Sequence, residues 1–544
     1  MGLYCLNIKF FYDIMGKTLF NFFLKGMIIM AVTDYVIMGA IVLYMIMMLV
    51  VGFVVSDRNK TSSDFFLGGR KLGPLVTAMS AEASDMSGWL LMGLPAVAMM
   101  TGLAEASWTA IGLAIGTYIN WLIVAKRIRI YSHRIDAFTI PDFFAKRFGD
   151  KSRTLTTISA IVIIIFFIPY TASGFSACGK LFSSLFGMDY MTAMIISAAV
   201  IIIYCTLGGF LAASTTDFIQ SIIMTIALFV VMGFGEGLVH GFGNVFENVK
   251  GLDGFLDLFK GFDVASGKTG SYGALPVAST LAWGLGYFGM PHILLRFMAI
   301  EDEKKLKLSR RVASTWVVIS MAIAILIGVV GYSLMKSGIL PQYANASAAE
   351  TIIVDISKFL SKYGYIPAFT GGIILAGILA STMSTADSQL LAAASSISQN
   401  LVQETFKVKL SQKKSMILAR ISVIVISVIA IFLARDPNSS VFRIVSFAWA
   451  GFGAAFGPVV LCALFWKRTN KYGAIAGMLL GGGMVFFWKF VIRVKFAGTI
   501  LDIYELLPAF ILGLAAIIIV SLLTKAPEKE ITEQFDKVKA EIKA

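Results

Sequence analysis

Residues 80–89 read SAEASDMSGW and lie inside an apolar segment that runs from about residue 74 to residue 102. The stretch places Glu82, Asp85, three serines and a glycine where a membrane-spanning helix normally carries hydrocarbon. A charge at the centre of such a helix costs about 2.5–3.5 kcal/mol, so an ionisable group at that depth needs a partner or a role. We interpret the stretch as a discontinuous helix built around an ion or a solute. The alternative is a solvated break between two shorter helices.

The composition is that of a membrane protein. The chain is 58% hydrophobic and 14% charged, whereas soluble domains are about 25% charged. Its mean hydropathy is +0.82. Apolar runs of spanning length recur from end to end and predict about thirteen transmembrane helices. The predicted spans are 34–55, 74–100, 105–125, 154–180, 190–212, 217–239, 275–298, 313–335, 366–396, 418–434, 441–466, 473–492 and 506–524.

The net charge of +14 is distributed in a pattern typical of membrane topology. Basic residues concentrate in alternate connections, and the intervening connections hold fewer. The basic connections are 58–71, 126–153, 304–311, 407–414 and 467–471. This is the positive-inside pattern, which argues against a nucleic-acid partner and for a lipid bilayer. It predicts a cytoplasmic C-terminal tail and, with an odd number of spans, an external start of the first span.

The two ends of the chain lie outside the predicted transmembrane domain, which covers residues 30–524. We interpret residues 1–29 as an N-terminal extension or a mis-assigned start, with Met30 as the true one; a signal peptide is the alternative. Residues 525–544 are predicted to form a cytoplasmic tail. One stripe of an amphipathic helix in that tail is formed by Ile531, Phe535, Val538 and Ile542.

Metal and enzyme chemistry find little support in the sequence. The four cysteines lie in or beside apolar segments, without disulfide or zinc spacing. The three histidines are scattered. Because neither a nucleophile–base set nor a metal motif stands out, an enzyme is the weakest interpretation.

A second interrupted segment, 275–298, follows the first by five spans. It holds Gly284, Gly286, Gly289 and Pro291 within LAWGLGYFGMPHILLRF, and these residues weaken a helix and free backbone groups. Transporters often contain inverted repeats whose first helices are interrupted at mid-membrane. The spacing therefore predicts a five-plus-five architecture, with a first repeat over 74–239 and a second over 275–466.

The ninth predicted span carries a hydroxyl face. Ser381, Ser384, Thr385 and Ser388 follow i, i+3, i+4, i+7 spacing, so they share one helical face, and Asp387 flanks them. A lone hydroxyl in a membrane helix usually bonds back to a carbonyl of its own helix. Four on one face, next to a carboxylate, favour a binding role instead.

An alkali-ion site follows if the first break faces these hydroxyls. Sodium is a hard cation that prefers oxygen ligands, and unwound backbone supplies carbonyls. We expect the carbonyls of Ala83 and Met86 to meet the hydroxyls of Ser384 and Thr385 near Asp85.

Aromatic residues accompany the second break. Trp283, Tyr287 and Pro291 are four apart, and Trp89 and Tyr170 are further candidates. Such rings are usually packing or interface anchors. Beside glycine breaks, we consider that they line a small amphipathic pocket, where a ring face suits the apolar part of a solute or attracts its cation.

These features coincide with five stretches that together resemble a known family. The stretches are DFFLGGRKLGP at 64–74, ASDMSGWLLMGLP at 83–95, GGFLAASTTDFIQ at 208–220, GYFGMPHILLRFM at 286–298 and MSTADSQLL at 383–391. In this order the chain resembles the solute:sodium symporters, most closely the bacterial sodium/proline symporters. The resemblance implies an all-α, leucine-transporter-like fold in the bacterial plasma membrane. It also implies sodium-driven L-proline uptake by alternating access, with sodium as coupling ion and no other cofactor.

The resemblance also assigns roles to individual residues. It implies that sodium is held by carbonyls of Ala83, Met86 and Ser381 and by hydroxyls of Ser384 and Thr385. Asp85 would serve sodium coupling, Asp217 the cytoplasmic ion-release route, and Arg70 coupling near an inner gate. The implied proline pocket consists of Ser87, Gly88, Trp89, Tyr170, Trp283, Tyr287 and Pro291.

The chain departs from the family pattern at three positions. Glu82 stands where the family carries a small or neutral residue, Met290 where glutamine is common, and Ser381 where alanine is frequent. Glu82 leaves proton coupling open as an alternative to sodium. Another solute of the same family, such as pantothenate, a sugar or a sialic acid, is the nearest alternative to proline. A membrane sensor or a channel is an alternative of a different class.

Overall fold

The computed structural model describes residues 32–56, 66–207 and 209–543; the extension predicted over 1–29 lies outside these ranges. Within them the chain is almost entirely helical, as predicted. The long helices are α2 (Val32–Ser56), α6 (Leu103–Ile119), α9 (Thr154–Phe186), α10 (Tyr190–Leu207), α11 (Phe210–Leu238), α15 (Leu306–Lys336), α18 (Tyr365–Ser395), α19 (Gln412–Leu433), α20 (Val441–Phe465), α21 (Lys471–Phe487) and α23 (Leu506–Leu523).

Shorter elements complete these helices or connect them. The short α-helices are α4 (Pro74–Ala83), α5 (Leu94–Thr101), α7 (Ala125–Arg134), α8 (Ile140–Arg147), α12 (Phe242–Lys250), α13 (Ala274–Leu281), α14 (Pro291–Ala299), α16 (Ala346–Ala349), α17 (Ile352–Ser361), α22 (Arg493–Lys495) and α24 (Lys529–Lys543). The 3₁₀ and π segments are η1 (Gly68–Arg70), η2 (Trp89–Gly93), η3 (Asn120–Val124), η4 (Ala282–Gly289), η5 (Glu303–Lys305), η6 (Ser396–Thr405) and η7 (Trp488–Ile492). One antiparallel hairpin pairs β1 (Lys260–Asp263) with β2 (Lys268–Ser271).

Ten helices of the described chain are long and apolar enough to cross a membrane. They establish a multi-pass membrane protein. Three predicted spans are not among these ten: the second and the seventh, which are interrupted, and the fifth, which forms a shorter apolar helix from Tyr190.

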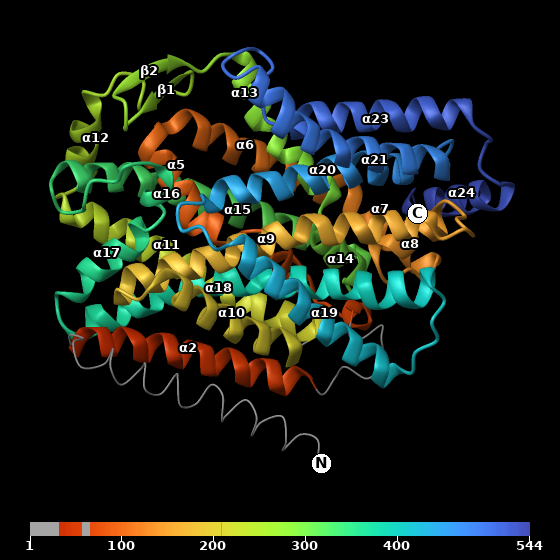
Figure 1. Cartoon of the computed structure of the whole chain (residues 1–544), viewed down its shortest axis with the longest axis horizontal. Coiled ribbons are helices and arrows are strands. Elements are labelled where there is room, and N and C mark those ends of the chain that lie inside the picture. The colour runs from red at the N-terminus through yellow and green to blue at the C-terminus, as the bar shows by residue number, and fades with distance from the viewer. Residues whose placement is uncertain (1–31, 57–65, 208, 544) are drawn as a thin grey trace.

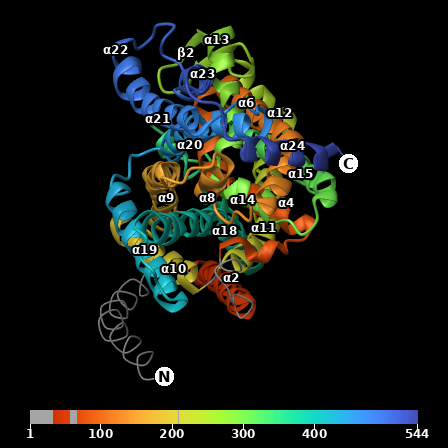
Figure 2. The same cartoon turned by 90° about the vertical axis from the view of Figure 1, so that its right-hand side faces the viewer.

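The helices run side by side along the long axis of the molecule (Figure 1). The β1–β2 hairpin, α12 and α17 lie at one end, and α7, α8 and α24 at the other. Figure 2 views the bundle from the end that carries α24. We call these the hairpin end and the tail end.

The first break separates α4 from η2 and α5. Pro74 begins α4 at a position where its missing N–H costs nothing. The helix ends at Ala83, where the Glu82 carbonyl accepts the amides of both Asp85 and Met86. Helical geometry resumes at Gly88, so residues 84–87 cross the interior without a regular helix. This is the interruption predicted from the polar stretch.

The second break separates α13 from α14 by the 3₁₀ segment η4 and an extended residue, Met290. Its glycines allow close approach to neighbouring helices. A Cβ at Gly286 would collide with the indole of Trp449 on α20, and one at Gly284 would collide with the carbonyl of Gly112 on α6. The second interruption is therefore held by packing that only glycine permits.

The tail-end termini of the two interrupted helices are joined. Leu72, before α4, and Ile300, after α14, form a parallel bridge. The Leu72 amide donates to the Ala299 carbonyl at 3.1 Å, and the Glu301 amide donates to the Leu72 carbonyl at 3.0 Å. The two broken helices therefore share an anchor at the tail end.

The final helix, α24, packs against α7. Phe535 and Val538 are buried, and the Phe535 ring lies 6.5 Å from Tyr131. The amphipathic stripe predicted for the tail thus faces the bundle.

Candidate functional site

The hydroxyl face of α18 meets the first break. Ser384 Oγ lies 2.8 Å from the Ala83 carbonyl oxygen, and Thr385 Oγ1 lies 3.5 Å from the same oxygen. Both hydroxyls also contact the Ser381 carbonyl, at 3.2 and 3.0 Å. All four residues are buried. Two hydroxyls and two carbonyls therefore form one cluster of neutral oxygens. Its shortest contact joins Ser384 to Ala83, which are 301 positions apart in the sequence.

This oxygen cluster has the chemistry that a hard monovalent cation prefers. Its donors are uncharged oxygens, without thiolate or imidazole. A hydroxyl can turn its proton away and offer a lone pair in the same direction as a neighbouring carbonyl. The residues present therefore fit an alkali ion. Met86 lies buried in the same break, but no hydrogen bond in the described chain joins it to Ser384 or Thr385.

The side chain of Asp85 contacts two tyrosines, and no hydrogen bond in the described chain joins it to these hydroxyls. Its carboxylate accepts a hydrogen bond from Tyr287 at 2.8 Å and a longer one from Tyr170 at 3.5 Å. Its backbone carbonyl accepts from Tyr170 at 3.1 Å and from the Trp89 indole at 3.0 Å. The backbone of Asp85 thus belongs to the break, and its side chain lies among the aromatic residues.

The predicted aromatic residues come together around this carboxylate. Trp89 and Trp283 lie 6.1 Å apart between ring centroids. Three further rings, which the sequence did not single out, complete the cluster: Phe442 at 5.2 Å from Trp283, Tyr504 at 5.3 Å from Trp283, and Trp449 at 5.1 Å from Tyr287. Aromatic character alone does not distinguish these three among the 43 phenylalanines, 17 tyrosines and 8 tryptophans of the chain.

The other predicted pocket residues have structural positions in the two breaks. Ser87 accepts a weak hydrogen bond from the Trp89 amide, at 3.5 Å. Gly88 lies against α9, where an added Cβ would be 2.8 Å from the Ala177 Cβ. Pro291 occupies the first turn of α14.

A buried ion pair lies one helical turn from the oxygen cluster, on the side of the tail end. Asp217 Oδ2 accepts from Ser80 at 2.7 Å and from Arg296 at 3.2 Å. Arg296 also donates to Ser388 at 2.5 Å. Ser80 lies about one turn before Ala83 on α4, and Ser388 lies one turn after Ser384 on α18. Asp217 was predicted from the resemblance, whereas Arg296 was missed; its only signal was a charge inside an apolar span.

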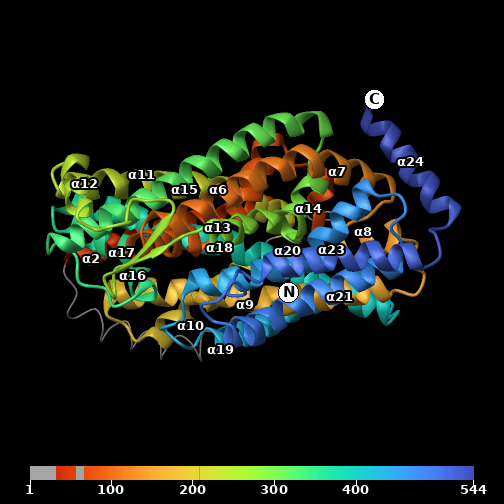
Figure 3. The same ribbon diagram turned by 90° about the horizontal axis from the view of Figure 1, so that it is seen from above.

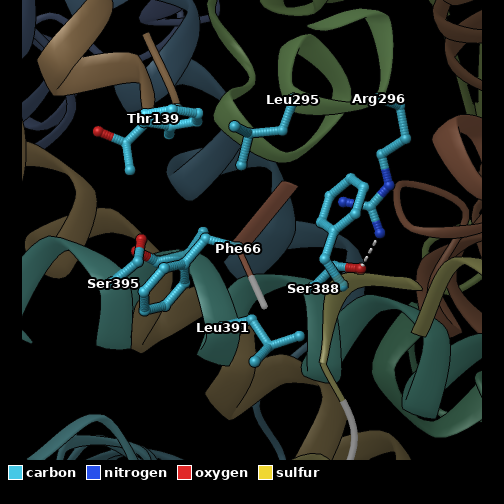
Figure 4. Close-up of a pocket in the computed structure, with 10 residues that line it drawn as sticks. Phe66, Thr139, Leu295, Arg296, Ser388, Leu391 and Ser395 are labelled. Atoms are coloured by element: carbon cyan, nitrogen blue, oxygen red, sulfur yellow. Dashed lines mark hydrogen bonds between the residues drawn. The ribbon is translucent and has the colours of Figure 1, made fainter. Parts of the chain in front are cut away.

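A pocket begins directly beside this pair. Arg296 and Ser388 form one wall, and Phe66, Thr139, Leu295, Leu391 and Ser395 are among the other lining residues (Figure 4). The pocket brings the tail-end surface of the bundle close to the Arg296–Asp217 pair.

Arg70 ties the tail-end anchor together. Its guanidinium donates to the carbonyls of Met298 at 2.7 Å and Ala137 at 2.6 Å, and to Ser132. Burial lowers the pKa of Arg70 to about 10, so the group stays charged at neutral pH. Gly68, Gly69 and Arg70 all have positive φ, which explains the glycine pair before the arginine.

Glu82 has a partner that the sequence did not predict. Its Oε1 accepts from the Trp121 indole at 2.8 Å, and its Oε2 has no hydrogen-bond partner among the described residues. The neighbouring Asn120 donates to the Tyr287 carbonyl at 3.0 Å. The π segment η3 thus contacts both breaks, the first through Trp121 and the second through Asn120.

Comparison with known proteins identifies one family over most of the chain. The model of the Sodium:solute symporter family matches residues 65–481. The osmoregulated proline transporter OpuE of Bacillus subtilis is 43% identical over 490 residues, which cover 90% of this chain and 94% of the relative. The sodium/proline symporter of Escherichia coli is 41% identical over 497 residues, which cover 90% and 94%.

Solved structures show the same fold at lower identity. A sodium-coupled sialic acid symporter in a substrate-bound, outward-open state superposes with a TM-score of 0.73 at 18% identity, over 92% of this chain and 99% of that one. The amino-acid-bound MhsT structure gives a TM-score of 0.51 at 14% identity, over 83% and 98%. From the match of the family model and the identity to these relatives, we conclude that the chain belongs to the sodium:solute symporter family.

Proposed function

We propose that the chain imports L-proline together with sodium, by alternating access across a bacterial plasma membrane. Two relatives at 43% and 41% identity are named as a proline transporter and a sodium/proline symporter. The observation that carries the proposal is the convergence of Ser384 and Thr385 on the Ala83 carbonyl, beside a buried aromatic cluster.

Sodium would bind at the oxygen cluster. Its proposed ligands are the carbonyls of Ala83, Met86 and Ser381 and the hydroxyls of Ser384 and Thr385. Because α4 ends at Ala83, a cation there would hold the end of α4 against α18. Sodium binding would in this way order the first break.

Proline would bind next to this ion, among the aromatic residues. The ring faces suit its apolar pyrrolidine, and the positive end of the half-helix that starts after the first break would favour its carboxylate. The proposed pocket comprises Ser87, Gly88, Trp89, Tyr170, Trp283, Tyr287 and Pro291, with Phe442 and Trp449 as additional walls.

Asp85 would couple the two ligands. Its backbone belongs to the break that the ion orders, and its carboxylate is held by Tyr170 and Tyr287 of the pocket. Each ligand would therefore favour the arrangement that the other requires, so that each raises the affinity of the other. The sodium gradient, with about 2.3 kcal/mol per charge per 100 mV of membrane potential, drives the cycle.

Release would take place toward the tail end. Asp217 and Arg296 lie one helical turn from the oxygen cluster on its tail-end side, next to the pocket of Figure 4. Arg70 would hold this end closed, since it joins the start of α4 to the ends of α7 and α14.

We further propose thirteen spans with a five-plus-five repeat. The repeats would cover 74–239 and 275–466, each beginning with an interrupted helix. The C-terminal tail would be cytoplasmic and the first span would start outside. Two features support this arrangement: the breaks stand five predicted spans apart, and the described residues of the basic connections fall on the side of α24.

Labelled proline uptake by the purified protein in proteoliposomes tests the proposal. We expect accumulation with an inward sodium gradient and little without it. Equal uptake in both conditions contradicts sodium coupling. Replacing sodium by choline at fixed pH, with and without a proton gradient, separates sodium from proton coupling. Competition by pantothenate, sugars and sialic acid identifies any other preferred solute.

A further inference from the structure

We propose that a groove between α6, η3 and α15 at the tail end is a binding site for an anionic phospholipid. A cavity of about 370 Å³ opens there, and residues of η3, α7, η5, the start of α15 and the end of α24 line it. Pockets that bind small molecules are typically about 300–1,000 Å³. The site lies outside the oxygen cluster and the aromatic cluster.

The cavity is lined by four basic and two acidic side chains. The bases are Lys126, Lys304, Lys307 and Arg310, and the acids are Glu303 and Glu541. Across the described residues, no carboxylate forms an ion pair with Lys304, Lys307 or Arg310. Glu541 is already paired with Arg134 at 3.3 Å. The cavity therefore has an excess of positive charge that the described part of the protein does not neutralise.

One lining residue of this cavity also has an unpartnered polar atom. Arg310 Nε is buried and has no hydrogen-bond partner in the described chain. A guanidinium binds phosphate oxygens through several N–H groups at once. These donors are of the kind that a phosphate group would satisfy.

The charged cavity continues into an apolar, exposed face. Ile115, Tyr118 and Leu122 are about half exposed along α6 and η3. Val318 and Ile319 are similarly exposed on the neighbouring α15, which runs beside α6 (Figure 3). Arg310 lies 5.3 Å over the Tyr118 ring, where the apolar face meets the basic cavity.

This order of surfaces matches a phospholipid rather than a soluble anion. Acyl chains would lie along the exposed residues of α6 and α15, and the phosphate would meet the basic cavity. Basic pockets between transmembrane helices on the cytoplasmic side commonly bind acidic headgroups. A free phosphate would use only the cavity and leave the apolar face unexplained.

The floor of the cavity connects to the first break. Trp121 lines the cavity, and its indole donates to Glu82, the residue before Ala83. Lys126, in another wall, donates to the Ile542 carbonyl of α24 at 2.9 Å. A lipid bound here would therefore contact elements that hold both the break and the tail.

Native mass spectrometry of the full-length protein in neutral detergent tests the site. We expect dioleoyl phosphatidylglycerol to bind more tightly than dioleoyl phosphatidylcholine. The variant K304Q/K307Q/R310Q should lose about a hundredfold in phosphatidylglycerol affinity, since each base near an anionic lipid contributes about fivefold. The matched control K409Q/K413Q/K414Q removes three exposed lysines elsewhere and should bind like the wild type.

Three results would overturn the proposal. One is equal phosphatidylglycerol affinity in the two triple variants, and another is equally tight binding of phosphatidylcholine to the wild type. The third is full displacement of the lipid by excess inorganic phosphate, which would identify a free-anion site. If the triple variant does not fold, Lys307→Gln and Arg310→Gln are measured singly, each with about a fivefold expected loss. The assay uses neither sodium gradient nor proline, so its outcome is independent of the transport proposal.

Discussion

The two interrupted helices differ in the donors that hydrogen-bond to their freed backbone carbonyls. Each break frees carbonyls in the interior, where an unpaired carbonyl is costly. In the first break, the Ala83 carbonyl is met by the hydroxyls of Ser384 and Thr385. In the second, the carbonyls of Trp283 and Tyr287 are met by N–H donors from Trp449 and Asn120, at 2.7 and 3.0 Å.

This difference decides what each break can bind. A hydroxyl oxygen can rotate its proton away and become a cation ligand alongside the carbonyl. An indole or amide N–H has no lone pair to offer and keeps its carbonyl occupied. The hydroxyls at the first break are therefore suited to give up their hydrogen bonds to the carbonyl and bind an ion. The N–H donors at the second break are suited to keep its backbone fixed, so that it presents aromatic side chains.

The largest expected effect concerns Asp85, which links the two breaks through Tyr287. Asp85→Ala would leave the buried Tyr287 phenol without its acceptor, at about 1–3 kcal/mol, whereas Tyr170 would keep the carbonyl of residue 85. We expect sodium-driven proline uptake to fall about a hundredfold or to vanish, with the protein still inserted. Asp253→Ala, at an exposed carboxylate of the hairpin end, is the control. Wild-type uptake kinetics in the Asp85 variant would remove this residue from the coupling mechanism.

The next effect separates hydroxyl from carbonyl ligands on α18. The double variant S384A/T385V removes both hydroxyls of the oxygen cluster, so the sodium concentration for half-maximal uptake should rise about tenfold or more. Ser381→Ala is the matched control, because its hydroxyl donates within its own helix, to Ile378, and only its carbonyl joins the cluster. A similar shift in the control would place the ion elsewhere on α18.

A smaller effect is expected from the packing of the second break. Gly286→Ala would push a methyl group into the Trp449 indole, and overpacking of this kind costs about 1–3 kcal/mol. The thermal midpoint of the purified protein, followed by size-exclusion chromatography after heating, should drop. Gly233→Ala on α11 meets no atom within 4 Å and should melt like the wild type. Equal midpoints would show that η4 is not packed as described.

The smallest effect tests the N–H donors of the second break. Asn120→Ala removes the donor to the Tyr287 carbonyl and should destabilise the protein by about 1 kcal/mol. Half-saturation by sodium should stay unchanged, because no ligand of the oxygen cluster is altered. The pattern is the reverse of that expected for S384A/T385V. A sodium shift in the Asn120 variant would contradict the division of roles between the breaks.

Several features of the site were predictable because they are local in sequence. The first break was predictable because Glu82 and Asp85 are charged residues in an apolar run, where a charge is costly. The second was predictable because the glycines before Pro291 destabilise a helix. The spacing of Ser381, Ser384, Thr385 and Ser388 places them on one face by helical geometry alone. The motifs that resemble the family supplied the remaining residues, such as Asp217 and Arg70.

Other features depend on which helices meet. Nothing in the sequence indicated that the Trp121 indole contacts Glu82. The role of Arg296 was likewise visible only from its contacts with Asp217 and Ser388. The side-chain direction of Asp85, toward tyrosines of α9 and η4, also follows from packing. Periodicity within one helix carries no information about the partner across the interface.

The sequence by itself determined a multi-pass helical membrane protein with two interruptions and a hydroxyl face, because hydrophobicity, helix weakening and helical period are properties of neighbouring residues. The tertiary structure alone decided which donors reach the freed carbonyls. Ala83 and Ser384 are 301 positions apart, and Trp283 and Trp449 are 166 apart. Contacts over such separations arise from the joint packing of many helices, and they give the first break hydroxyl partners and the second break N–H partners.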